Sequence, residues 1–238
     1  MGLLLAALVV AGCGSAPPRL GTQGVDGLTI PTPSPKPADF RDGVDNPWLP
    51  LSPGSNWTYS LSGGGRRHTV RVTVQDRSPV ISGIDTTEVR RAELDTRGAV
   101  VSLSLQWYAQ DLAGNVWLFG VEPVTSTGAA VLRPEPSWRA GVGGAEAGIA
   151  MLASPRVGDG YVRAADPGAV EDLGRVVALD VELGTEVGDL GGVVLTEDTS
   201  VFDPGRRIQR WYAPEIGLVR QSAMDGSADL ELLSFDRG

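Results

Sequence analysis

The sequence predicts an all-β protein, in which a curved antiparallel meander sheet, half-barrel or sandwich-like, follows a signal peptide and a disordered linker. Apolar and polar residues alternate in several short runs, as in half-buried strands. Turn-forming residues, such as those at 203–205 and 225–226, separate the runs at intervals of about 8–15 residues. Helical periodicity is weak, since the best helical candidate, residues 170–177, is interrupted by Gly174.

The first segment is an uncharged apolar run of about ten residues, the core length of a signal peptide. It is too short to span a membrane, which takes about 20 apolar residues. The run ends in Val10, Ala11 and Gly12, followed by Cys13, the only cysteine. This order resembles the signal peptide and lipobox of a bacterial lipoprotein, which implies cleavage before Cys13 and fatty acylation of its thiol. The alternative is an ordinary apolar segment with a chance cysteine.

The composition predicts three regions: a lipoprotein signal peptide at 1–12, a lipidated cysteine with a tether at 13–45, and a single β domain at 46–238. The tether is rich in Pro, Gly and Ser and has few large apolar residues, so it cannot bury a core. A proline-rich chain extends by about 3.1 Å per residue at most. Within the domain, residues 126–160 form the one long segment predicted to be irregular.

The strands are predicted from side chains at every second position, which share one face of an extended chain. Trp57 and Tyr59 form the first such pair. The clearest later runs contain Val70, Val72 and Val74; Val101, Leu103, Leu105 and Trp107; Val193 and Leu195; and Leu230 and Leu232.

The charge balance limits the partners. The chain has 29 acidic and 20 basic side chains and a net charge of −9, which opposes binding to nucleic acid and to anionic lipid headgroups. We therefore expect no nucleic-acid partner, and contact with the membrane only through the N-terminal lipid. A single cysteine also excludes an intramolecular disulfide and a zinc site made of several cysteines. We expect no cofactor.

Several segments resemble a group of secreted bacterial lipoproteins of the actinobacterial type. The segments that carry the resemblance are 46–59, 107–120, 137–141, 147–149 and 211–219. The resemblance covers most of the predicted domain. It implies a curved antiparallel sheet exposed outside the cytoplasmic membrane, and it implies no activity.

Catalytic motifs are sparse. His68 is the only histidine, and its place beside a glycine turn at the start of a strand favours a surface position over a Ser-His-Asp site. Asp111 and Asn115 could hold calcium, but their spacing is also typical of a hairpin turn, which we favour. We therefore predict no metal site and no enzymatic activity. The alternative is an envelope hydrolase or metal-assisted enzyme whose Asp and Glu residues meet only in the fold.

Aromatic side chains are the remaining candidates for a functional surface. Neighbouring aromatics in a strand face opposite sides of the sheet, so one enters the core and the other is available for a ligand or partner. The candidate surface consists of Trp107, Tyr108, Trp117, Trp138, Met151, Trp211 and Tyr212. Trp138 and Met151 would form a lid over an apolar small molecule, or the surface would bind an envelope protein. The alternative is that these residues are only core.

Together these features predict a lipid-anchored lipoprotein on the extracytoplasmic face of the bacterial cell membrane, with a binding or scaffolding role.

Overall fold

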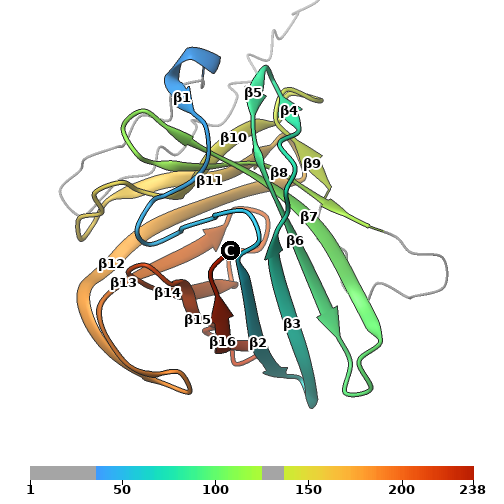
Figure 1. Cartoon of the computed structure of the whole chain (residues 1–238), viewed down its shortest axis with the longest axis vertical. Coiled ribbons are helices and arrows are strands. Elements are labelled where there is room, and N and C mark those ends of the chain that lie inside the picture. Colours follow the sequence, from blue (N-terminus) through green and yellow to red (C-terminus); the bar gives the residue numbers. More distant parts are fainter. Residues whose placement is uncertain (1–35, 125–136) are drawn as a thin grey trace, which may run out of the picture.

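The computed structural model describes residues 36–124 and 137–238, and nearly all of their regular structure is β-strand (Figure 1). The predicted all-β fold is confirmed. Within these two ranges, the only helical element is a 3-10 turn, η1 (Pro37–Asp39), and no helix is long and apolar enough to cross a membrane. Residues 170–177, the best helical candidate, lie instead in a strand. The strand requires glycine at position 174, because a Cβ on this residue would lie 2.3 Å from Cε2 of Tyr161.

Most strands are joined by short turns to the next strand in the chain. In chain order they are β1 (Phe40–Arg41), β2 (Asn56–Gly63), β3 (Arg66–Val74), β4 (Val80–Ile81), β5 (Ile84–Asp85), β6 (Thr87–Leu94), β7 (Val100–Asp111), β8 (Val116–Pro123), β9 (Trp138–Arg139), β10 (Glu146–Met151), β11 (Gly160–Asp166), β12 (Val170–Thr185), β13 (Gly188–Ser200), β14 (Arg207–Ala213), β15 (Gly217–Ala223) and β16 (Asp229–Asp236).

The strands form a closed barrel rather than a half-barrel. Antiparallel pairing joins 14 of the described strands in the order β1-β7-β6-β3-β2-β16-β15-β14-β13-β12-β11-β10-β8-β9. Because β7 pairs with β8 as well as with β6, 12 of these strands close into a ring. The hairpin β4–β5 forms a separate sheet.

Irregular pairing bends the sheet enough to close it. Register shifts interrupt β7–β8, β11–β12, β12–β13 and β14–β15, and such bulges bend a strand and increase its twist. Gly148 of β10 permits a close approach to β11, since a Cβ at this position would lie 2.3 Å from the backbone carbonyl carbon of Arg163. The predicted meander is therefore curved by specific bulges and glycines.

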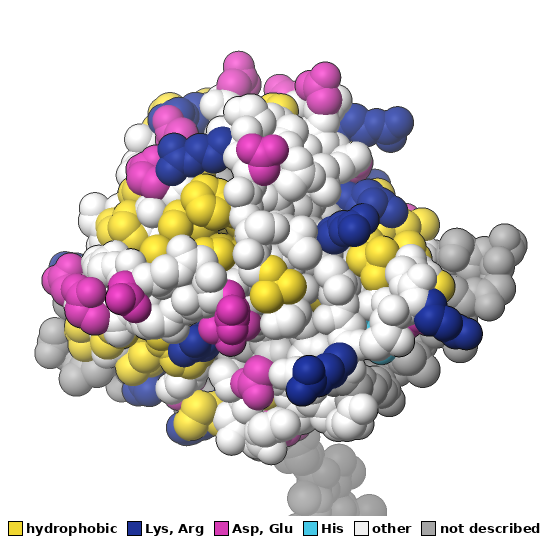
Figure 2. All heavy atoms as spheres, turned by 60° about the horizontal axis from the view of Figure 1, so that its bottom comes forward, with side chains coloured by type: hydrophobic (Ala, Val, Ile, Leu, Met, Phe, Trp, Pro, Cys, Tyr) yellow, Lys and Arg dark blue, Asp and Glu magenta, His cyan; other side chains and the backbone are white. Residues whose placement is uncertain are grey.

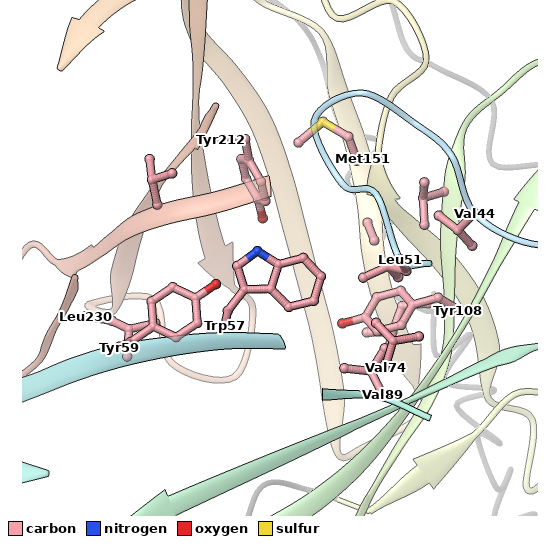
Figure 3. Close-up of a cluster of buried hydrophobic side chains, with 14 of the residues drawn as sticks. Val44, Leu51, Trp57, Tyr59, Val74, Val89, Tyr108, Met151, Tyr212 and Leu230 are labelled. Atoms are coloured by element: carbon pink, nitrogen blue, oxygen red, sulfur yellow. The ribbon is translucent and has the colours of Figure 1, made fainter. Parts of the chain in front are cut away.

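The buried side chains form two clusters. In the first, Trp57 and Tyr59 of β2 meet Tyr108 of β7 and Tyr212 of β14 from the facing walls (Figure 3). The second contains Trp107 and other aromatics of β7 and β8, and Ile81 and Ile84 of the β4–β5 hairpin pack into it. Trp107 and Tyr108 thus enter different clusters, as expected for neighbours in a strand.

The N-terminal part of the described chain packs against one end of β7. Phe40 and Arg41 pair with Asp111 and Gln110, and Val44 is buried in the first cluster. Residues 36–45 therefore belong to the fold, although their composition placed them in the tether. Likewise, β9 and β10 lie within 126–160, the segment predicted to be irregular.

Candidate functional site

The seven predicted surface residues are distributed over both clusters. Tyr108, Trp138, Met151 and Tyr212 belong to the first cluster, and Trp107 and Trp117 belong to the second. Six are buried, and Trp211 is half-buried against the first cluster. The structure therefore brings four of them together as core. The predicted lipidation and cleavage residues, Val10, Ala11, Gly12 and Cys13, lie outside the described residues.

A buried ion network joins β11, β13 and β14. The Nε atom of Arg163 lies 3.1 Å from Oδ2 of Asp198, and the guanidinium of Arg210 pairs with the same carboxylate. Burial lowers the pKa of Arg210 to about 10, and the charge of Arg163 acts in the same direction. Burial raises the pKa of Tyr161, which lies beside both guanidiniums, to about 12. Because Asp198 pairs directly with both cations and Asp172 offsets part of their remaining charge, we interpret this network as structural.

A pocket opens at one end of the barrel, between the β2–β3 turn, the β6–β7 hairpin and the β15–β16 turn. We call it the His68 pocket, and its wall includes Leu61, His68, Glu93, Ser102 and Ser227. Figure 2 looks toward the lower end of Figure 1, where these turns lie, and shows acidic, basic and hydrophobic side chains interspersed among uncharged polar and backbone atoms.

Close contact between two turns builds one side of this pocket. Gly63 has φ +142°, and a Cβ on it would lie 2.2 Å from the carbonyl oxygen of Ser227 and 2.8 Å from Cα of Ala228. Only glycine allows the β2–β3 turn to approach the β15–β16 turn this closely. The glycine run that begins at the last residue of β2 therefore shapes the pocket wall.

His68 and Glu93 form the polar centre of the pocket. Nδ1 of His68 hydrogen-bonds Oε1 of Glu93, and the two side chains are 11% and 20% exposed. Register explains the contact, because Val70 is paired with Glu93 and His68 is the next residue of β3 on the same face. His68 lies on a strand, as the sequence predicts, but it is half-buried. Sequence reasoning missed Glu93, since the two residues are 25 positions apart and only the strand pairing brings them together.

The candidate calcium site at Asp111 and Asn115 is a hairpin turn, as the sequence favours. Oδ1 of Asp111 accepts the backbone N–H of Asn115 at 2.8 Å, while Oδ2 accepts from Nδ2 of Asn115 and from Nε1 of Trp117, both at 2.9 Å. Both carboxylate oxygens are therefore used within the hairpin. No group of three or more His, Cys, Asp and Glu residues suited to a metal occurs among residues 36–124 and 137–238.

Fold and site together define a closed antiparallel β-barrel with a polar pocket at one end. No protein-family profile and no curated protein sequence matches the chain. Two solved structures are similar to it. One is named a "putative exported protein with YmcC-like fold", from Bacteroides fragilis, with 13% identity, a TM-score of 0.48 and coverage of 79% of this chain and 98% of the other.

The second similar structure is named a "putative lipoprotein", from Parabacteroides distasonis. It has 11% identity and a TM-score of 0.42, and the match covers 82% of this chain and 100% of the other. At these identities and TM-scores, neither likeness assigns a family or a function to the chain.

Proposed function

We propose that this chain is a lipoprotein of the bacterial cell envelope whose barrel binds a small ligand in the His68 pocket without catalysis. The observation that carries the proposed binding is the pocket itself, with a half-buried His–Glu pair in its wall. The apolar leader ending at Cys13 supports anchoring on the extracytoplasmic face of the membrane.

Strand β7 runs between the start of the described chain and the pocket. β1, near that start, pairs with Gln110 and Asp111 at one end of β7. Val101 and Ser102, at the other end, line the pocket. A strand rises about 3.4 Å per residue, so roughly 30 Å separates the two ends. In the proposed function, a barrel anchored through its N-terminus can present this pocket to the aqueous side.

A hydrolase is the second candidate, and the His68–Glu93 pair is the observation that favours it. A carboxylate that holds Nδ1 of a histidine is the arrangement that prepares the other ring nitrogen to take a proton. Ser62, Ser102 and Ser227 line the same pocket. Hydrolysis of p-nitrophenyl esters or glycosides that is lost in His68→Gln would favour this second function over binding alone.

The anchor is tested by fractionation and intact mass. We expect protein from the native membrane to begin at Cys13 and to carry the mass of its acyl chains, and Cys13→Ser to appear in the soluble fraction. Pro17→Ser is the matched control and should remain with the membrane. Equal membrane retention of Cys13→Ser and wild type would overturn the anchoring.

The binding function is tested by native mass spectrometry of the full chain, released gently from its own membrane. We expect a co-purifying small molecule that is lost when Ser102→Trp fills the pocket and retained when Ser222→Trp adds the same ring outside it. Identical spectra for the wild type and both variants, with no bound mass, would remove support for ligand binding.

A further inference from the structure

We propose that the ligand of the His68 pocket is an uncharged molecule rich in hydroxyl groups, a saccharide or polyol, which donates hydrogen bonds to Nε2 of His68 and Oε2 of Glu93. This inference rests on the proposed binding function and specifies its ligand.

The centre of the pocket contains polar atoms that have no hydrogen-bond partner among the described residues. The contact between Nδ1 of His68 and Oε1 of Glu93 places the proton of a neutral imidazole on Nδ1, which leaves Nε2 as an acceptor. Across the part of the chain that the structure describes, neither Nε2 of His68 nor Oε2 of Glu93 has a hydrogen-bond partner. The centre of the pocket therefore offers two acceptors, and a fitting ligand must bring donors.

Hydroxyl groups and short apolar side chains surround these acceptors. The hydroxyls of Ser62, Ser102 and Ser227 can each donate and accept, which suits a ligand whose hydroxyls do the same. Leu61 and Val101 supply short apolar surfaces against which C–H groups of a sugar ring can pack. A flat or long apolar ligand would leave the polar groups of the pocket without partners, at a cost in free energy.

The pocket wall contains one acid, Glu93. An anionic ligand such as a fatty acid or a phosphate would meet the repulsion of this carboxylate. A cationic amine would also bring donors and would be attracted by Glu93, but it has fewer hydroxyl groups to pair with the three serines, and ethanolamine tests it directly. The pocket also lies at the end of β7 opposite β1, and in the proposed envelope location a water-soluble ligand would reach it from the aqueous side.

His68 is itself the probe for a test, because a single histidine gives unambiguous imidazole signals in ¹⁵N NMR. The full chain in detergent would be titrated with glucose, xylose, N-acetylglucosamine and sorbitol. Ethanolamine and decanoate would be the amine and the apolar anion probes. We expect at least one of the four hydroxylated probes to shift the Nε2 signal saturably. Ethanolamine and decanoate should leave the signal unchanged.

Glu93→Gln tests the acceptor role, since it keeps the shape of the side chain but replaces one carboxylate oxygen by an amide donor. We expect its affinity for the hydroxylated probe to fall by about tenfold or more, the effect of losing a hydrogen bond to a charged group. Glu122→Gln is the matched control, because Glu122 is exposed, pairs with Arg139 and lies outside the pocket. Its affinity should equal that of the wild type.

The outcomes separate this inference from the function on which it rests. A shift of Nε2 by ethanolamine or decanoate alone, lost in Ser102→Trp, overturns the hydroxylated ligand but retains a binding pocket. Silence of Nε2 to all four hydroxylated probes also overturns the inference. If, in addition, native mass spectrometry finds no bound mass that is lost in Ser102→Trp, the proposed binding function is overturned too.

Discussion

Asp198 is the residue at which the structure makes its sharpest prediction about stability. Its carboxylate is 8% exposed and lies between the guanidiniums of Arg163 and Arg210, which are 16% and 14% exposed. Asp198→Asn removes the negative charge with almost no change in size. Two buried like charges then remain close together, and the charge of Arg163 already lowers the pKa of Arg210 in the native barrel.

The expected magnitude follows from this burial. Removing one partner of a buried ion pair costs about 3–5 kcal/mol, whereas exposed pairs contribute about 0–1 kcal/mol. Asp172 also interacts with both guanidiniums and continues to offset part of their charge. We therefore expect the lower end, about 3 kcal/mol, a large part of a typical domain stability of about 5–15 kcal/mol.

Urea unfolding followed by tryptophan fluorescence measures this loss. With a slope of about 2 kcal/mol per molar urea, the midpoint of Asp198→Asn should fall by about 1.5 M at unchanged slope. Glu182→Gln, an exposed acid on β12, is the control and should unfold with the wild type. Arg210→Met should lose less than Asp198→Asn, since it leaves Arg163 and Asp198 as a one-to-one pair. Coincidence of the Asp198→Asn and Glu182→Gln midpoints would refute the reasoning.

Three further predictions concern buried positions. Asn46→Ala should lower the unfolding free energy by about 1–3 kcal/mol, because the part-buried carbonyl of Gly114 and the buried carbonyl of Leu152 lose a donor that now lies 3.0 and 3.1 Å away. Equal urea midpoints of the variant and the wild type would contradict this. Gly174→Ala should lower it by about 1–3 kcal/mol and weaken the near-UV circular dichroism, since the new Cβ meets the ring of Tyr161 at 2.3 Å; an unchanged spectrum would argue against that contact. Between pH 10 and 12, stability should fall with rising pH, because burial raises the pKa of Tyr161 to about 12 and that of Tyr59 further, so both folded phenols keep protons that the unfolded chain releases. The pKa of Arg210 is lowered to about 10, so the folded chain loses a proton there that the unfolded chain keeps, and this offsets the effect of one phenol. The net loss of unfolding free energy, measured by urea unfolding at each pH, is then about 1.4 kcal/mol per pH unit. Tyr161→Phe should flatten this slope, and an equally steep slope in that variant would disprove the assignment.

The sequence predicted the strands well because their signal is local. Alternation of apolar side chains and glycine-rich turns is set by neighbours in the chain, and the run from Val101 to Trp107 lies in β7 as expected. Closure of the barrel depends on the pairing of β7 with β8 as well as β6, together with bulges in several pairs, which the pattern of one strand does not contain. Gly174 illustrates the limit, since in the sequence it resembles a helix breaker and in the fold it provides space for a ring from another strand.

The candidate site was less predictable for the same reason. His68 was identified as the only histidine, but its partner Glu93 is one of many scattered acids until the register of β3 and β6 is known. The aromatic residues were predicted to be a surface for a ligand or partner, with core packing as the alternative, and six of the seven are buried. Their burial could not be read from alternation, because alternation separates two faces and does not say which face is covered. Trp107 and Tyr108 are both buried, since each face of β7 has its own cover.

The change of side-chain character along the barrel accounts for the polar lining of the His68 pocket. Pairing places Val74 opposite Val89, and further along the same face it places Val70 opposite Glu93, with His68 beyond. The valine end meets the N-terminal segment, where Asn46 donates to backbone carbonyls and the chain closes over the first cluster. At the other end a charged and an ionisable side chain replace the valines, and apolar residues there would bury more area at less desolvation cost. These two polar side chains, at the end where the barrel opens, are the feature on which the proposed binding function rests.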